Sequence, residues 1–110
     1  MALYMFQASY TDASIKAMIA NKDNRKEAAG KAIAAGGGKM LSLYFCFGDY
    51  DIIAIAEMPD NTSMAGASLG ISSTGAFTSV KSTVLLSPEE MSESLEKAEA
   101  FLPSYRPATG

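Results

Sequence analysis

The lack of histidine limits which side chains of this chain could do chemistry. Its 110 residues include no histidine and one cysteine, Cys46. Histidine is the usual general base near neutral pH and the commonest metal ligand. Ser–His and Cys–His dyads therefore cannot form, and a zinc site of histidine or thiolate ligands cannot be built within one subunit. We expect no metal and no cofactor, which leaves carboxylates, lysine, tyrosine and Cys46.

The candidates for binding a ligand are four polar side chains, and structural alternatives compete with this role: Tyr44, Asp51, Glu57 and Lys81. Tyr44 could donate or accept a hydrogen bond, although an interface tyrosine is the commoner outcome. Glu57 could act as a general base if it were buried, or it could pair with Lys81 across a barrel or stay solvated. Asp51 could be a functional carboxylate, but it directly follows a turn. We therefore favour hydrogen bonds from backbone N–H groups to its side chain that fix the loop. Cys46 is interpreted as a small core residue.

These candidates lie on or near a predicted β-hairpin, because Gly48-Asp49 separates two apolar runs at residues 39–47 and 51–58. The predicted register places Phe47 opposite Tyr50, Tyr44 opposite Ile53, and Met40 opposite Glu57. One face of this hairpin is almost wholly apolar and should lie under helices: Leu41, Leu43, Phe45, Phe47, Tyr50, Ile52, Ala54 and Ala56. The opposite face should be left open by the helices: Met40, Ser42, Tyr44, Cys46, Asp51, Ile53, Ile55 and Glu57.

The remaining elements follow from capping signals and periodicity. A strand over residues 2–9 precedes a helix that starts at Thr11-Asp12, and Asp23 or Asn24 caps a second helix over residues 25–35. The three glycines at 36–38 follow a helix and precede a strand, which indicates a helix end rather than a phosphate loop. Asp60 caps a helix over residues 61–72, and a strand follows at 76–86. A capping box at residues 87–90 begins a last helix that Pro103 stops.

This order predicts an α+β fold of the ferredoxin-like kind, βαββαβ, with a four-stranded antiparallel sheet and an extra C-terminal helix. We predict one domain over residues 1–102 and a tail over 103–110. The open face carries aliphatic residues, among them Ile53 and Ile55, which favours a partner sheet over water. We therefore expect a homodimer or a larger oligomer in which two sheets pack face to face and enclose a lumen.

Composition indicates which partners and which cellular compartment to expect. The net charge is −3 and the charges are mixed along the chain, so no basic stripe supports a nucleic-acid partner. No apolar run approaches the roughly 20 residues of a membrane-spanning helix, and we expect no membrane partner. A single cysteine fits a reducing compartment, which favours the cytoplasm.

The residues of the hairpin also resemble those of a known protein family. The chain resembles the GYD-domain family, whose Gly-x-Tyr-Asp signature corresponds here to Gly48, Tyr50 and Asp51. Supporting matches are Tyr4, Thr11-Asp12, Ile15-Lys16, Arg25, Gly37-Gly38, Tyr44, Glu57 and Pro59-Asp60. The resemblance covers residues 2–87 and implies the dimeric α+β barrel group, which includes cofactor-independent monooxygenases, isomerases, haem proteins and ligand-sensing domains. The sequence departs from the family pattern at residues 75–81.

Two functions remain open at this point. The first is a homo-oligomeric module that binds a small apolar or aromatic molecule, or serves only for assembly. The second, implied by the resemblance, is a cofactor-independent monooxygenase or isomerase, which needs an activated acid or base in the lumen. The lack of histidine and the isolated carboxylates favour the first function.

Overall fold

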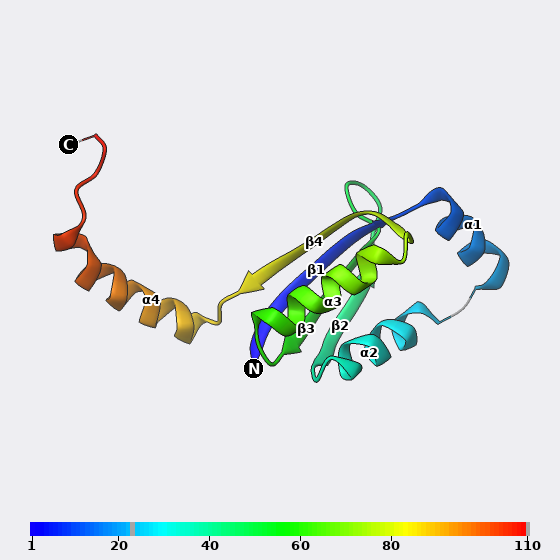
Figure 1. Ribbon diagram of the computed structural model, residues 1–110, viewed down its shortest axis with the longest axis horizontal. Coiled ribbons are helices and arrows are strands. Elements are labelled where there is room, and N and C mark those ends of the chain that lie inside the picture. The colour runs from blue at the N-terminus through cyan, green and yellow to red at the C-terminus, as the bar shows by residue number, and fades with distance from the viewer. Residues whose placement is uncertain (23, 110) are drawn as a thin grey trace.

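A four-stranded antiparallel sheet with helices on one face forms the body of the computed structural model, which describes residues 1–22 and 24–109. The strands are β1 (Ala2–Tyr10), β2 (Lys39–Phe45), β3 (Ile52–Met58) and β4 (Phe77–Leu85), and they lie side by side in the order β2-β3-β1-β4 (Figure 1). The first and last strands of the chain are therefore neighbours, with the hairpin β2–β3 beside β1. The predicted ferredoxin-like fold is confirmed.

Each of the described α-helices begins where a side chain accepts a hydrogen bond from the first turn. The helices are α1 (Asp12–Asn21), α2 (Arg25–Ala35), α3 (Asn61–Ser73) and α4 (Pro88–Phe101), followed by a short 3-10 helix, η1 (Leu102–Ser104). Thr11, Asn24, Asp60 and Ser87 are the N-caps of the four α-helices. The alternative cap of α2, Asp23, lies outside the described residues. At the other end of α2, Gly37 adopts a φ of +84°, as expected for a glycine that ends a helix.

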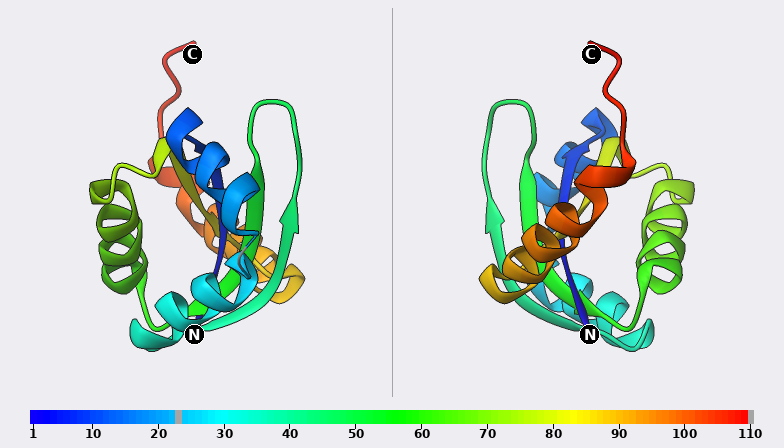
Figure 2. Two further views of the ribbon diagram at one scale, coloured as in Figure 1. Left: turned by 90° about the vertical axis from the view of Figure 1, so that its right-hand side faces the viewer. Right: turned by 90° about the vertical axis from the view of Figure 1, so that its left-hand side faces the viewer.

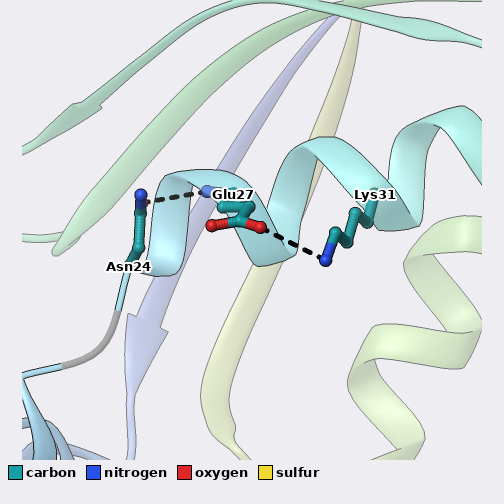
Figure 3. Close-up of polar contacts among 3 residues, drawn as sticks. All are labelled: Asn24, Glu27 and Lys31. Atoms are coloured by element: carbon teal, nitrogen blue, oxygen red, sulfur yellow. Dashed lines mark hydrogen bonds and ion pairs between the residues drawn. The ribbon is translucent and has the colours of Figure 1, made fainter.

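The start of α2 shows the local polar contacts in detail (Figure 3). The side-chain oxygen of Asn24 accepts from the backbone N–H of Glu27 at 3.1 Å. The Glu27 carboxylate pairs in turn with the Lys31 ammonium at 3.2 Å, one helical turn further on. Both charged side chains are largely exposed, so this pair adds only a few tenths of a kcal/mol, about 0.3–0.5. The hydrogen bond to Asn24 satisfies one of the backbone N–H groups that have no partner within the first turn of a helix.

The hydrophobic core lies between the sheet and the helices. Residues of β3 alternate in burial, and Ile52, Ala54, Ala56 and Met58 are the buried ones. Met58 and Ala56 pack with Tyr4 of β1, Ile33 of α2 and Met64 of α3 in one cluster. A second cluster contains Ala8, Tyr10 and Ile52. Because Ile33 and Met64 contact the same strand residues, α2 and α3 cover the same face of the sheet.

The hairpin register differs from the predicted one at its base. Tyr44 lies opposite Ile53 as predicted, but the register shifts between Met40 and Ser42, which makes Leu41 an extra residue in β2. Lys39, and not Met40, consequently lies opposite Glu57. Met40 turns to the helix side and packs against the core cluster. The prediction that Met40 belongs to the open face is wrong.

The hairpin also ends earlier than predicted. The paired strands stop at Phe45 and Ile52, so residues 46–51 form a loop in place of a two-residue turn. Phe47 lies in this loop with 98% of its surface exposed, and its predicted place under the helices is wrong. The Cys46 backbone N–H still donates to the Asp51 carbonyl at 2.8 Å, which keeps these two residues opposite each other. Gly48 adopts a φ of +143°, a conformation that favours glycine.

Helix α4 projects away from the body (Figure 1). The chain measures 59 × 31 × 22 Å, and its radius of gyration is 17.7 Å. A compact chain of this length would have a radius of gyration of about 13 Å. Every residue of α4 is exposed. The structure thus consists of a body, residues 1–86, which contains the sheet and its helices, and an arm, which begins at residue 87 and contains α4 and η1. Among the described residues, no helix has the length and apolar character needed to cross a bilayer.

Candidate functional site

The sheet face away from α2 and α3, which we call the open face, carries most of the predicted site residues. Strand pairing gives its rows directly, because residues opposite each other on neighbouring strands share a face. One row runs from Tyr44 through Ile53 and Gln7 to Lys81. The next rows toward the base of the hairpin are Ser42, Ile55, Met5 and Thr83, and then Lys39, Glu57, Leu3 and Leu85.

The centre of the open face is aliphatic and its margins are polar. Met5 and Leu3 on β1 and Ile53 and Ile55 on β3 are half-buried by their neighbours within the chain. Tyr44, on the edge strand β2, is 69% exposed. Lys81, on the opposite edge strand β4, is also exposed. The face can therefore hold an apolar body at its centre and make polar contacts at its edges.

The structure brings Tyr44 and Lys81 into one row but does not bring Glu57 to them. Three strand spacings separate Tyr44 from Lys81, or about 14 Å between backbones. Glu57 lies opposite Leu3, whereas Lys81 lies opposite Gln7, so the two are four residues apart along β1. Within one chain, the base directly opposite Glu57 is Lys39, which sequence reasoning missed because it did not foresee the bulge at Leu41.

Asp51 lies at the end of the hairpin, where it fixes the backbone. Its carboxylate oxygen accepts from the backbone N–H of Tyr10 at 2.9 Å. Its own N–H donates to the Ala8 carbonyl at 2.9 Å. The expected partner was the loop itself, and this is corrected: the partner is the end of β1. Pairing between β1 and β3 ends at Ala8 and Ile52, so beyond that pair the Asp51 side chain replaces a strand as the acceptor.

We expect Asp51→Asn to lower the free energy of unfolding by about 1 kcal/mol, because a neutral amide oxygen accepts more weakly than a carboxylate. Denaturant unfolding at a fixed protein concentration measures this. Ser79→Asn, at an exposed position of β4 near the same end of the sheet, is the control and should change the value little. A variant at Asp51 that unfolds like the parent but loses ligand binding would make Asp51 a ligand group instead.

The rest of the signature lies in the same loop. Gly48 occupies the turn, and Tyr50 is half-buried, with its carbonyl accepting from the Cys46 thiol at 3.1 Å. Cys46 is likewise half-buried and belongs to this loop rather than to the core. Together with Asp51, these contacts bind the loop to β1 and to itself. The signature residues thus shape the hairpin end, and the open face presents the side chains available to a ligand.

The carboxyl groups of Asp60 and Glu90 have lowered pKa values, and both take part in capping a helix. The pKa of Asp60 lies below its usual value because its oxygen accepts from the Ser63 backbone N–H at 2.8 Å. The pKa of Glu90 is lowered in the same way by the Ser87 backbone N–H at 2.9 Å. Neither group lies on the open face. Among residues 1–22 and 24–109, no three acidic or cysteine side chains are grouped so that they could hold a metal ion.

A groove that sequence reasoning missed lies on the helix side of the sheet. It is a groove between α2 and α3 with a cavity of about 180 Å³, and its walls are almost entirely apolar. Figure 2 shows α3 standing apart from α1 and α2. Small residues leave this space: Ala28 and Ala32 on α2, Ala54 on the sheet, and Ala67 on α3. The small-residue face of α2, visible in the sequence, was the available signal.

Comparisons with known proteins agree with this fold. The family model described as GYD domain matches residues 4–95. No curated protein sequence matches the chain. The crystal structure of FFRP-DM1 is similar, with 14% identity, a TM-score of 0.53, and coverage of 78% of this chain and 100% of that chain. TTHA0845 from Thermus thermophilus has 18% identity and a TM-score of 0.52, over 79% of this chain and 95% of that chain. MtbAldR has 13% identity and a TM-score of 0.51, over 78% of this chain and 52% of that chain. At these identities the similarity establishes the fold alone.

Proposed function

The chain belongs to the GYD-domain family, and on this premise we propose that it is a self-associating domain that binds a small molecule. The open face of one copy packs against the open face of a second copy. The two sheets enclose a lumen for a small apolar or aromatic molecule. The observation that carries this proposal is the aliphatic centre of the open face, which no described helix of the same chain covers.

The apolar residues of the open face require a second layer to pack against. A sheet buries its apolar face against another layer, and exposed apolar patches of this kind mark interaction sites. Leu3, Met5, Ile53 and Ile55 form a continuous patch, because they occupy the central strands β1 and β3 on neighbouring rows. A second copy supplies a matching patch by two-fold symmetry. The same contact that forms the dimer therefore creates the lumen.

The polar margin indicates the chemistry of the ligand. Tyr44 and Lys81 end one row of the open face, and Gln7 lies between them beside Ile53. A phenol, an amide and an ammonium group can bind a carbonyl, phenolate or carboxylate oxygen. The central aliphatic side chains fit an aromatic ring. The ligand that matches both features is an aromatic compound with an anionic or carbonyl oxygen, and Glu57 with Lys39 lies at the rim.

Binding without catalysis is the function we favour. A cofactor-independent monooxygenase or isomerase needs an acid or base placed against its substrate. Glu57 and Lys81, the two groups that could form such a pair, lie on different rows of the sheet within one chain. They could meet only across the interface between two copies. A binding module, in contrast, needs only the lumen and its polar margin.

A fluorescent probe tests the ligand class. We expect anilinonaphthalene sulfonate, an aromatic anion, to bind the assembled protein, and Lys81→Met to weaken its binding at least 10-fold through loss of the ammonium group. The control is Arg25→Met, which removes the cation that lines the groove on the other face. Titration of probe fluorescence gives both dissociation constants. If Arg25→Met weakens binding and Lys81→Met does not, the site is the groove and the proposed lumen is wrong.

A further inference from the structure

Helix α4 has an apolar side that no described part of its own chain covers. Met91, Leu95 and Leu102 lie on this side with Ala98 between them, and the three large side chains are 49%, 59% and 65% exposed. A lone helix of 14 residues is only marginally stable in water. Its capping box at Ser87 and Glu90 helps, but most helical stability in proteins comes from packing an apolar side. The arm therefore requires a surface to pack on.

The groove between α2 and α3 is a surface of the matching kind. Its floor is formed by strand residues such as Ala54 and Ala56, and its walls by small side chains such as Ala29 and Ala67. Leucine and methionine side chains spaced one helical turn apart can enter a concave apolar groove, as amphipathic helices commonly do. Neither the groove nor the apolar side of α4 is covered within the chain. If α4 packed in the groove, both surfaces would be buried.

Charge favours the same pairing. Residues 87–110 contain five glutamates against one lysine and one arginine, whereas residues 1–86 carry seven acidic and seven basic side chains. The net charge of the protein therefore lies on the arm. Helix α2 carries three basic side chains and one acidic one, of which Arg25 lines the groove, and α3 has no charged residue. An acidic helix is attracted to α2, which carries more basic than acidic side chains, and two acidic arms repel each other.

The direction of the chain makes a second copy the occupant. Leu85 pairs with Leu3 at the far end of β4, and only Leu86 and Ser87 separate β4 from α4. The arm continues outward from that end of the sheet and leaves the body (Figures 1 and 2). Between β3 and α3 the chain turns back over the sheet within two residues, whereas between β4 and α4 it does not. We propose that α4 of one copy lies in the α2–α3 groove of a second copy, with its apolar side facing the groove.

This arm exchange uses the helix side of the sheet and is independent of pairing between open faces. A reciprocal exchange between two copies buries both arms, which doubles the area for one symmetric contact. The arm ends in a stacked pair, Phe101 and Tyr105, with ring centroids 5.7 Å apart, and both rings are more than half exposed. These rings extend the apolar surface that the partner covers.

Cross-linking between two distinguishable chains tests the proposal. Both chains carry Cys46→Ser, which removes the native thiol. An isotopically heavy chain carries Ala98→Cys on the arm, and a light chain carries Ala67→Cys in the groove. The two are refolded together and treated with a short bismaleimide. We expect a heavy–light product at least 10-fold more abundant than with Gly66→Cys, the matched control one residue away. A Cβ at Gly66 meets no atom within 4 Å, so that position faces away from the groove.

Each other outcome overturns the proposal. Equal yields from Ala67→Cys and Gly66→Cys, or no product while circular dichroism shows folded chains, mean that the arm does not occupy the groove. A heavy–heavy product that dominates means that the arms pair with each other. A product within a single chain carrying both cysteines, formed at high dilution, means that the arm packs on its own body. Repeating the mixture with Ile53→Lys in both chains separates this proposal from the open-face contact, because the arm product should persist.

Discussion

Ile53→Lys is expected to raise the dissociation constant of the contact between open faces at least 100-fold, which corresponds to about 3 kcal/mol. Ile53 lies between Tyr44 and Gln7 on the open face and is half-buried by its own chain. A lysine there can reach water in a single chain. Between two packed sheets its charge would be buried without a partner, which is strongly unfavourable. Concentration-dependent sedimentation velocity measures the change.

The control for this substitution is Leu69→Lys. Leu69 lies on α3, is 71% exposed, and does not line the groove. Any association that α4 provides is common to both variants, so the difference between them reports the open face alone. Equal dissociation constants for Ile53→Lys and Leu69→Lys, with both variants folded by circular dichroism, would remove the open face as an association surface.

Gly38→Ala is expected to lower the free energy of unfolding by about 3 kcal/mol, at the upper end of the usual cost of overpacking. Gly38 joins α2 to β2, where its backbone passes directly against β3. A Cβ at this position would fall far inside van der Waals distance of the Glu57 carbonyl oxygen and the Met58 sulfur. Met58 is fully buried and the Glu57 backbone belongs to the sheet, so neither atom can yield easily.

Gly66→Ala is the matched control, because it makes the same change in open space. We expect it to stabilise the protein by about 1 kcal/mol through helix propensity. Denaturant midpoints at one protein concentration compare the two variants, since association itself shifts apparent stability. Gly38→Ala within about 0.5 kcal/mol of the parent would contradict the close approach of the loop to β3, because that range is what a contact-free substitution produces.

Local patterns predicted the elements of the fold because each carries its own signal. Asp60 before α3 and the capping box before α4 mark helix starts by side chains that accept from the first turn. Tyr44 opposite Ile53 followed from alternation along both strands of the hairpin. A one-residue slip there would place apolar residues on the polar face, so the pattern defines the register.

The predicted register was wrong at the base of the hairpin, where apolar and polar residues do not alternate. Met40 and Leu41 are both apolar, so a bulge between them changes the exposed face without an evident loss of apolar burial. The pattern could not therefore distinguish the observed register from the predicted one. The predicted position of Phe47 under the helices was wrong for a related reason. An aromatic residue after a strand looks like one more strand residue, although here it lies exposed in the loop.

Contacts between distant segments were the least predictable part of the candidate site. The acceptor role of Asp51 was expected from its place after the turn, but its partner is Tyr10, which is 41 residues away. That contact depends on where the pairing between β1 and β3 ends, which no local pattern reveals. The groove between α2 and α3 likewise depends on the spacing of two helices. Small residues such as Ala32 and Ala67 permit this space but do not determine it.

Sedimentation equilibrium of the unmodified protein tests the central claim, self-association, most directly. The chain has a mass of 11.6 kDa. Our account predicts a mass that is an integral multiple of this value, two chains or more, at micromolar concentration, because the open face and the arm both require a second copy. A mass of one chain throughout a concentration series into the high micromolar range would contradict it.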